Sequence, residues 1–379
     1  FCQEKMADYL CQELTMVRHT SVICRKADAT EPITPKMERV SGSVASPRLD
    51  SVIAMVFSSS RTKILPLIEG EKVFIDGKAG TTGLRIYERL EKRSDILLQT
   101  LSDAERKDPA RRKEALNSCD IAFLCLPDAA AEEAVAMLEN PEVTVIDTST
   151  AHRTSPGWAY GFPELSAEFA GRISESRRIA VPGCHAGGFI ALVYPLVSAG
   201  ILNKDARLFC HSLTGYSGGG KKMIGEYEAE GREALLDAPR QYALGQNHKH
   251  LKEMKGITGL ENSPVFCPVV SDFYSGMEVT VPLFANSLAK GCTAEDIRRV
   301  YKNCYSGEIV SYDGTLGESG FLSAKELSGR DSMRIGVFGN EERILLVAVY
   351  DNLGKGASGA AIECMNIVLG ADRKTGLIL

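Results

Sequence analysis

Short apolar runs alternate with helix-like patterns along the chain from residue 72 onward. Short apolar runs predict buried strands at 72–76, 96–101, 119–127 and 143–147. A helix is predicted at 129–138, and another after the first strand, where Leu84, Ile86, Tyr87 and Leu90 recur at helical spacing. Strands that alternate with helices in this way predict a parallel sheet with both faces covered.

The pattern changes in the second half of the chain. Apolar runs at 208–213, 279–283 and 344–350 predict strands of an α+β region, and a helical pattern starts at Leu251. A last helix is predicted at 360–369, where small residues permit close packing back on the first region. The chain has 379 residues, which is enough for two or three domains.

A glycine-rich turn joins the first predicted strand to the first helix. It reads Gly77-Lys78-Ala79-Gly80-Thr81-Thr82-Gly83. Between a strand and a helix, such glycines let backbone N–H groups approach the pyrophosphate of a dinucleotide at the helix N-terminus. Because the spacing is GxxGxxG rather than GxGxxG, a tight turn without a ligand is nearly as good an interpretation of this motif alone.

Polar residues that follow two of the strands bear on ligand choice. Asp103 is suited to bind a ribose 2′-hydroxyl, which favours NAD, whereas Ser102 with Arg106 is suited to a 2′-phosphate, which favours NADP. After the fourth strand, Arg153 is suited to clamp an anionic substrate group; a surface position is the alternative.

Cys184 lies at a second strand-to-helix turn. The apolar run 179–181 precedes it, and the apolar run 190–196 predicts a helix after it. Backbone N–H groups and the positive end of a helix dipole lower the pKa of a thiol at such a place and favour a thiolate nucleophile. The alternative is a buried structural cysteine.

Two further stretches carry candidate chemistry. The glycine-rich loop 215–222 ends in two lysines and is suited to a phosphate or a cofactor amide, or it is a flexible surface loop. The stretch Asn247-His248-Lys249-His250 holds two of the six histidines of the chain, directly before a predicted helix. A histidine of near-neutral pKa is the expected acid–base partner of a cysteine nucleophile.

Composition narrows the possible partners and the compartment. The net charge is −5 and there is no long basic block, so we expect no nucleic-acid partner. No apolar run approaches the roughly 18 residues that a membrane helix needs. Eleven cysteines without a CxxC pair argue against a zinc site and a disulfide framework, and favour a reducing compartment, here the cytoplasm.

Residues 1 to about 70 form an extension of unknown role. The stretches 41–47 and 58–60 are linker-like, and basic residues outnumber acidic ones between Met16 and Pro66. A targeting peptide, a poorly ordered extension and a start-site artefact are all compatible with this composition.

Taken together and in this order, the motifs resemble those of the N-acetyl-gamma-glutamyl-phosphate reductases of the shorter type, over about residues 72–379. The six motifs lie at 77–83, 147–153, 182–185, 215–221, 247–250 and 352–359. The resemblance implies a Rossmann-like doubly wound α/β domain, formed by 71–183 and 352–379. It also implies an α+β catalytic domain of the glyceraldehyde-phosphate dehydrogenase type, at 184–351. NADP as cofactor and a homo-oligomer, dimer or tetramer, follow from the same resemblance.

The resemblance also assigns roles to individual residues. It puts Cys184 in the nucleophile position and the acid–base role on the His248/His250 pair, of which we prefer His250. Expected substrate contacts come from Ser149, Arg153 and Lys221. Expected cofactor contacts come from Gly77, Gly80, Thr81, Thr82, Gly83, Ser102, Arg106, Pro127, Ser217, Gly218 and Asn352. The stretch 268–277 has the position of the family's substrate loop but lacks the basic or further histidine residue expected there.

The implied activity is a step of arginine biosynthesis. It is the NADPH-dependent reduction of N-acetyl-glutamyl 5-phosphate to N-acetyl-glutamate 5-semialdehyde and phosphate, through a thioester on Cys184. Two alternatives stay open: aspartate-semialdehyde dehydrogenase, which uses the same Cys/His logic, and a non-catalytic dinucleotide-binding protein.

Overall fold

The computed structural model describes residues 16–17, 20–21, 71–93, 95–317 and 319–379. The chain divides into two units, 1–70 and 71–379. In the first unit, strands β1 (Met16–Val17) and β2 (Thr20–Ser21) pair antiparallel. The other residues of the extension expected at 1–70, including the linker-like stretches, lie outside the described residues.

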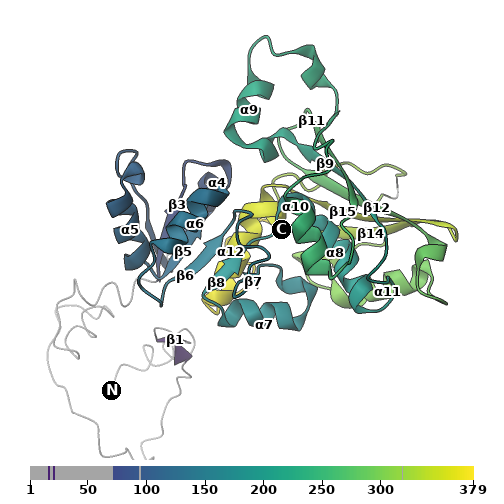
Figure 1. Ribbon diagram of the computed structural model, residues 1–379, viewed down its shortest axis with the longest axis horizontal. Coiled ribbons are helices and arrows are strands. Elements are labelled where there is room, and N and C mark those ends of the chain that lie inside the picture. The colour runs from purple at the N-terminus through teal and green to yellow at the C-terminus, as the bar shows by residue number, and fades with distance from the viewer. Residues whose placement is uncertain (1–15, 18–19, 22–70, 94, 318) are drawn as a thin grey trace, which may run out of the picture. The chain divides into compact units, whose positions relative to one another are not determined.

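A parallel six-stranded sheet forms the first half of the second unit (Figure 1). Its strand order is β4-β3-β5-β6-β8-β7, and every neighbouring pair is parallel. The strands are β3 (Glu71–Asp76), β4 (Ile96–Gln99), β5 (Ile121–Leu124), β6 (Thr144–Asp147), β7 (Ala159–Tyr160) and β8 (Arg178–Ala180). The order reverses between β3 and β5, and ligands of such sheets bind at the carboxyl ends of the strands at this point.

Helices cover both faces of the parallel sheet. Alternate residues of its strands belong to two separate apolar cores: Val73 and Ile75 of β3 lie in one, and Phe74 lies in the other. The helices on the first face are α4 (Thr81–Leu90), α7 (Ala167–Glu175) and α12 (Gly359–Val368); those on the second are α5 (Pro109–Ser118) and α6 (Asp128–Ala136). The predicted parallel sheet covered on both faces is therefore confirmed.

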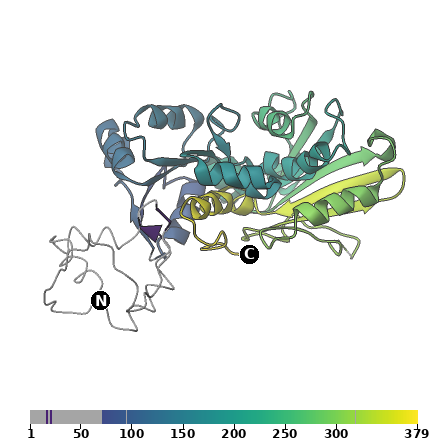
Figure 2. The same ribbon diagram turned by 90° about the horizontal axis from the view of Figure 1, so that it is seen from below.

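The last helix of the chain packs on the first sheet. Ala360, Ile362 and Met365 of α12 are buried in the same core as Ile146 of β6. Figures 1 and 2 show α12, in yellow, beside the blue elements that form the start of this unit. Both ends of the second unit therefore contribute to one layered structure.

A mixed seven-stranded sheet forms the second half. Its order is β10-β11-β9-β12-β15-β14-β13. The strands are β9 (Phe209–Gly215), β10 (Arg240–Gln241), β11 (Val265–Ser271), β12 (Met277–Phe284), β13 (Val310–Tyr312), β14 (Met333–Gly339) and β15 (Arg343–Tyr350). Its apolar core also contains residues of α8 (Cys184–Ser198), α10 (His250–Thr258) and α11 (Ala294–Cys304).

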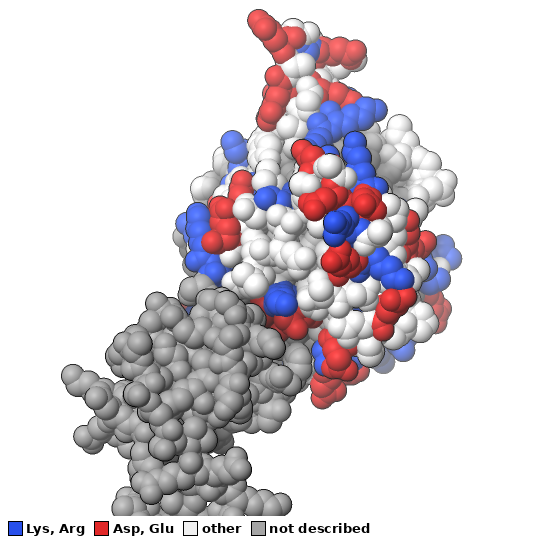
Figure 3. All heavy atoms as spheres, turned by 90° about the vertical axis from the view of Figure 1, so that its left-hand side faces the viewer, with Lys and Arg blue, Asp and Glu red and all other residues white. Residues whose placement is uncertain are grey.

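The remaining elements are short turns and one further helix. They are η1 (Glu105–Lys107), η2 (Pro163–Leu165), η3 (Tyr216–Gly219), α9 (Gly220–Glu228), η4 (Ala234–Asp237), η5 (Ala285–Ser287) and the π-helical turn η6 (Gly354–Ser358). Among the described helices, none combines the length and apolarity that crossing a membrane requires. On the face shown in Figure 3, Lys and Arg side chains are interspersed with Asp and Glu.

Candidate active site

A pocket of about 460 Å³ lies between the two sheets. It is lined by residues that follow β3, β5 and β6 of the parallel sheet, by the start of α8, and by η3 and the segment 352–357 that follow strands of the mixed sheet. Twelve of the residues predicted for the site line this pocket: Gly80, Thr81, Thr82, Pro127, Ser149, Arg153, Cys184, Ser217, Gly218, His248, His250 and Asn352. The fold therefore brings together motifs that are far apart in the sequence.

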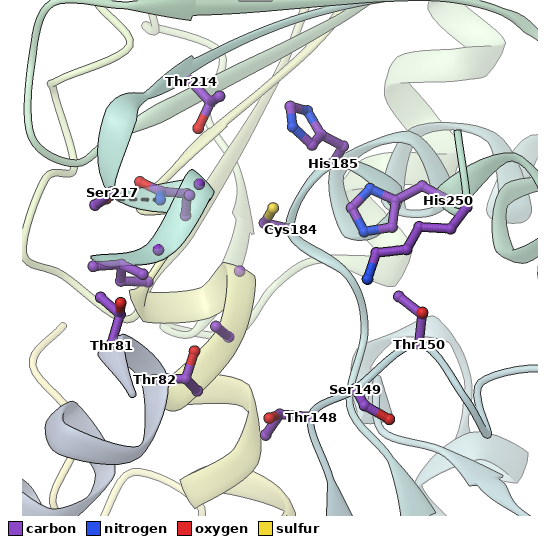
Figure 4. Close-up of a pocket in the computed structure, with 18 of the residues that line it drawn as sticks. Thr81, Thr82, Thr148, Ser149, Thr150, Cys184, His185, Thr214, Ser217 and His250 are labelled. Atoms are coloured by element: carbon purple, nitrogen blue, oxygen red, sulfur yellow. Dashed lines mark hydrogen bonds between the residues drawn. The ribbon is translucent and has the colours of Figure 1, made fainter. Parts of the chain in front are cut away.

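Cys184 is the first residue of α8. The apolar strand β8 ends at Ala180, and the N-cap of the helix is Gly183, which has an extended backbone. Figure 4 shows the Cys184 side chain at the centre of the pocket, with Ser217 on one side and the rings of His185 and His250 on the other. The helix that presents Cys184 is buried over most of its length, because its residues from Phe189 to Val193 belong to the core of the mixed sheet.

Burial controls the ionisation of Cys184. It raises the pKa of the Cys184 thiol to about 11, against the opposing effects of the Arg153 guanidinium and of the backbone N–H of His185. The helix start lowers this pKa as expected, but the expected thiolate is not favoured, because loss of hydration outweighs the local dipoles. A neutral thiol at this position needs a base to take its proton when it reacts.

The two predicted histidines lie next to the nucleophile. The ring centroids of His248 and His250 are 4.7 Å apart, and the backbone N–H of His250 donates to His248 Nδ1 at 3.3 Å. Burial lowers the pKa of both rings, with help from the positive charge of Arg153 for His250 and of Lys249 for His248. His250 is buried, and a Cβ added to Gly183 would lie 2.4 Å from its Nε2, so this ring packs directly against the turn that carries Cys184.

A third histidine, His185, completes the cluster. Its Nδ1 lies 2.6 Å from Ser212 Oγ, and its Nε2 lies 2.7 Å from the Tyr242 hydroxyl. Burial lowers the pKa of His185 to about 3, so the ring is neutral at physiological pH. His185 is predicted only as part of a motif and without a role, because both of its partners are brought to it by folding.

Glu253 connects the histidine helix with the nucleophile turn. Its carboxylate accepts hydrogen bonds from the Gly183 N–H at 2.8 Å, the Tyr160 hydroxyl at 2.8 Å and Arg153 Nη1 at 3.0 Å. Glu253 and Arg153 are both buried and compensate each other's charge. Glu253 is not among the residues predicted for the site, although it follows His250 by three residues and so faces the same side of α10.

Arg153 has three of its five N–H groups committed to the protein. Besides the bond to Glu253, Nε donates to the Val181 carbonyl at 2.8 Å and Nη2 donates to the Thr148 carbonyl at 3.0 Å. Its two other N–H groups have no hydrogen-bond partner among the described residues, and the side chain lines the pocket. Its predicted contact with an anionic substrate group stays a prediction.

The other predicted substrate residues differ in position. Ser149 lines the pocket, and its hydroxyl donates to Asp147 at 2.8 Å. Lys221 is exposed on α9 and does not line the pocket. Lys249, for which the sequence predicts no role, does line the pocket, and its Nζ lies 3.7 Å from the Asp128 carboxylate.

The glycine turn after β3 is as tight as the sequence predicts. Gly77 has φ +88°, and a Cβ there would lie 2.3 Å from the Cys125 carbonyl oxygen. A Cβ on Gly83 would lie 2.4 Å from the Gly77 carbonyl oxygen. Gly80 is the N-cap of α4, so the free N–H groups of that helix start at the pocket. These residues fit the pyrophosphate of a dinucleotide.

Residues of the second half line the same pocket as this turn. Asn352 donates to Ser217 Oγ at 3.0 Å and accepts from the Gly276 N–H at 2.9 Å, which fixes η3 beside the end of β15. Ser102 and Arg106 lie outside the pocket lining, where they pair with Glu105 at 2.6 Å and Asp103 at 2.7 Å. Their predicted contacts with a 2′-phosphate stay predictions.

Two family models match the second unit of the chain. The model described as "Semialdehyde dehydrogenase, NAD binding domain" matches residues 72–172. The model described as "Semialdehyde dehydrogenase, dimerisation domain" matches residues 184–352. The two matches meet close to the nucleophile turn, although the predicted domain boundaries themselves stay predictions.

Curated relatives match over nearly their whole length. N-acetyl-gamma-glutamyl-phosphate reductase 2 of Pseudomonas putida is 46% identical over 305 residues, which cover 79% of this chain and 97% of the relative. N-acetyl-gamma-glutamyl-phosphate reductase of Rhizobium meliloti is 47% identical over 307 residues, which cover 79% of this chain and 99% of the relative.

Solved structures with this fold are more distant in sequence. Aspartate semialdehyde dehydrogenase II of Vibrio cholerae, complexed with ASA, has a TM-score of 0.61 at 17% identity, covering 79% of this chain and 98% of that one. Aspartate semialdehyde dehydrogenase of Candida albicans, solved with NADP, has a TM-score of 0.57 at 15% identity, covering 80% and 99%. At these identities the likeness concerns the fold alone.

Proposed function

Because this chain belongs to the N-acetyl-gamma-glutamyl-phosphate reductase family, we propose that it reduces N-acetyl-glutamyl 5-phosphate to N-acetyl-glutamate 5-semialdehyde and phosphate, a step of arginine biosynthesis. One observation carries the proposal: Cys184, the histidine pair and the glycine turn line the same pocket. A nucleophile, a base and a dinucleotide site are the three parts that this reaction needs.

The first step is acyl transfer to Cys184. As the sulfur attacks the acyl carbon, neutral His250 accepts the thiol proton. A C–S bond forms and the bond from carbon to the phosphate oxygen breaks, so phosphate leaves with the electron pair and a thioester remains. Backbone N–H groups at the start of α8 are candidates to stabilise the developing oxyanion.

The second step releases the aldehyde. When bound, the nicotinamide cofactor supplies the hydride that reduces the thioester. A base then takes the hydroxyl proton of the resulting thiohemiacetal while the C–S bond breaks, and the thiolate of Cys184 is regenerated. His250 first gives the proton that it took from the thiol to the alkoxide formed by hydride addition, which completes the thiohemiacetal. Because burial lowers the pKa of His250, the ring is then neutral and able to accept the hydroxyl proton in this step. His248 is the second candidate for this role.

We propose NADP as the cofactor. Gly77, Gly80 and Gly83 fit a pyrophosphate, and further proposed contacts come from residues that line the same pocket: Thr81, Thr82, Pro127, Ser217, Gly218 and Asn352. Ser102 and Arg106 are the proposed partners of the 2′-phosphate. Their present pairs with Glu105 and Asp103 are exposed, and such pairs are weak enough for a phosphate to replace them.

Cationic groups on one wall suit an anionic substrate. The two remaining N–H groups of Arg153 and the ammonium group of Lys249 are proposed partners for its phosphate and carboxylate, with Ser149 as a further donor. Lys221, on α9, does not line the pocket. The stretch 268–277 contains no Lys or Arg. We therefore expect Arg153 and Lys249 to provide the positive charges that bind the substrate.

We also propose that the protein forms a homodimer through the mixed sheet. The matching family model is a dimerisation domain, and Phe209, Val265, Phe284 and Leu345 of this sheet have large exposed fractions. A tetramer is the alternative assembly. The proposed cytoplasmic location is supported by the cysteines, since all eight that the structure describes are free thiols.

The test is the reverse reaction, followed by absorbance of the reduced cofactor. With N-acetyl-glutamate semialdehyde and NADP⁺, reduction of NADP⁺ is expected to require inorganic phosphate and to be lost in Cys184→Ser, while Cys304→Ser, an exposed cysteine, retains it. Activity with aspartate semialdehyde instead would keep the mechanism and change the substrate. No activity with either aldehyde would favour a non-catalytic binding protein.

A further inference from the structure

Three buried tyrosines donate their hydroxyls to backbone carbonyls of α8. Tyr301 donates to Leu192 O at 2.5 Å, Tyr305 donates to Ala191 O at 2.7 Å, and Tyr350 donates to the carbonyl of Cys184. The first two act on the middle of the helix, where no reacting group lies. Tyr350 acts on the nucleophile residue itself.

The Tyr350 hydroxyl lies at the first turn of the helix. Besides donating to the Cys184 carbonyl, it accepts from the Gly188 N–H at 3.1 Å. These are the two backbone groups that bond to each other in a regular α-helix. A Cβ on Gly188 would lie 2.5 Å from the Tyr350 oxygen, so the missing side chain at 188 is what admits the hydroxyl.

Holding the Cys184 carbonyl also fixes the direction of the next N–H. The carbonyl of Cys184 and the N–H of His185 belong to one planar trans peptide and point in opposite directions. The backbone N–H of His185 lowers the pKa of the Cys184 thiol, against the larger effect of burial. Rotating this peptide plane would turn the N–H away from the sulfur.

We propose that Tyr350 is a positioning residue for the nucleophile: its hydroxyl holds the Cys184 carbonyl, and this directs the His185 N–H at the sulfur. The inference rests on the proposed role of Cys184. Tyr350 is suited to such a role because its side chain is fully buried at the end of β15, in the core that α8 shares with the mixed sheet.

Other ionisable groups also affect the pKa of the Cys184 thiol, and the test variant does not substitute any of them. Arg153, from the segment after β6, favours the thiolate, whereas Glu253 on α10 disfavours it. The hydroxyl of Tyr242, beside β10, faces the same site, as do the rings of His185, His248 and His250. A change confined to the Tyr350 hydroxyl leaves all of these unaltered.

The test is the rate at which Cys184 is alkylated by iodoacetamide, measured by peptide mass spectrometry from pH 7 to 10. For Tyr350→Phe we expect an alkylation rate about tenfold lower at each pH below the thiol midpoint, since losing one hydrogen bond to the thiolate raises that midpoint by about one unit. The turnover number is expected to fall about tenfold while both KM values change less than about twofold.

Tyr305→Phe is the matched control. It removes a buried hydroxyl that donates to a carbonyl of the same helix, away from Cys184. Both variants are expected to lower the melting temperature, but Tyr305→Phe should leave the alkylation rate and the turnover number unchanged. An alkylation rate in Tyr350→Phe equal to that in Tyr305→Phe would overturn the proposal and leave only a packing role.

A second variant keeps the test decisive if Tyr350→Phe does not fold. Gly188→Ala places a methyl group where the Tyr350 hydroxyl lies and is expected to lower the alkylation rate in the same way. An unchanged rate in this variant would contradict the proposal. Since alkylation needs no substrate, its outcome is independent of the turnover assay that tests the proposed function.

Discussion

The lack of a side chain at Gly183 lets the proposed base, His250, lie close to the proposed nucleophile, Cys184. It precedes Cys184 in the chain, and the side chains of Arg153 and His250 pack against its α-carbon. Its N–H is held by Glu253. A residue without a side chain is therefore needed for the base and the nucleophile to come this close.

Gly183→Ala tests this close approach. The added Cβ would lie 2.3 Å from Arg153 Nη1 and 2.4 Å from His250 Nε2, so both side chains must move. We expect the turnover number to fall at least about tenfold, because a small displacement of a catalytic base has an effect of this size. NADP⁺ affinity, measured by fluorescence titration, should change little.

Gly171→Ala is the control for Gly183→Ala. Gly171 lies in α7, and a Cβ there meets nothing within 4 Å. This substitution should leave turnover unchanged and stabilise the helix by about 0.5–1 kcal/mol. Equal turnover in both variants would mean that His250 does not need its present position.

The lowered pKa of His185 leads to a second prediction at the scale of a single residue. Its pKa is lowered from 6.5 to about 3 in the folded protein, so the folded state binds fewer protons than the unfolded state between these values. Its contribution to stability is complete above pH 6.5 and is lost as the pH falls. At pH 5 this group alone lowers the free energy of unfolding by about 2 kcal/mol relative to pH 8.

The measurement is urea unfolding at pH 8 and pH 5. His185→Gln keeps groups able to bond to Ser212 and Tyr242 but removes the titration. The loss of stability between the two pH values should be smaller in the variant by that amount. The same loss in both proteins would show that His185 is not held neutral by burial.

At the scale of elements, a buried ion cluster fixes η6 against α12 and η2. Lys355 Nζ lies 2.9 Å from Glu164 and 2.5 Å from Glu363, and Arg373 pairs with the same two carboxylates. Gly356 of the same turn is so close to Cys184 that a Cβ on it would lie 3.1 Å from the Cys184 Cβ. The cluster therefore supports one wall of the pocket.

Lys355→Ala should destabilise the protein by about 3–5 kcal/mol, because it leaves buried carboxylates without their main counter-charge. Burial and Glu363 raise the pKa of Glu164 to about 7. A raised folded-state pKa contributes stability that is present at low pH and lost as the pH rises through this value. Urea unfolding should therefore show a smaller defect at pH 5.5 than at pH 8.5.

Lys374→Ala is the control for Lys355→Ala. Lys374 is partly exposed and pairs with the exposed Glu308, so its removal should not change stability measurably. A defect of Lys355→Ala that is the same at both pH values would show that Glu164 does not take up a proton.

Sequence patterns predict the elements that contain a short apolar run, such as β3, β5 and β6. They do not predict the strand β11, because it contains Pro268, which has no N–H for a ladder, and because the stretch from 268 onward has the position of a loop. It nevertheless pairs with β9 and β10.

Within the candidate site, local motifs located the glycine turn, Cys184 and the histidine pair. They did not locate the partners of His185, which lie 27 and 57 residues away in the sequence. Nor did they predict the raised pKa of Cys184, because burial comes from the whole fold whereas the helix start is visible locally. Local sequence patterns thus do not predict the interactions between segments that are distant in the chain.

At the scale of the whole molecule, one face of the mixed sheet exposes apolar side chains. Phe209 of β9 is 54% exposed and Val265 of β11, its partner in register, is 46% exposed. Phe284 of β12 is 64% exposed. Apolar side chains gathered on one sheet face favour association with another copy of the chain.

Phe209→Glu should weaken this association. A charge in an apolar interface has to be dehydrated without a partner, so the variant is expected to shift towards monomer in light scattering. Leu97→Glu, on β4 of the other sheet, is the control and should keep the native mass. If Phe209→Glu keeps the native mass as well, the subunits associate through another surface.

The central claim is that Cys184 carries the acyl group. Its most direct test is to mix the protein with N-acetyl-glutamate semialdehyde and NADP⁺ without phosphate, quench in acid and measure peptide masses. We predict an N-acetylglutamyl thioester on Cys184 that disappears when phosphate is added before quenching. No adduct on Cys184 while NADP⁺ is reduced, or an adduct on another cysteine, would contradict the account.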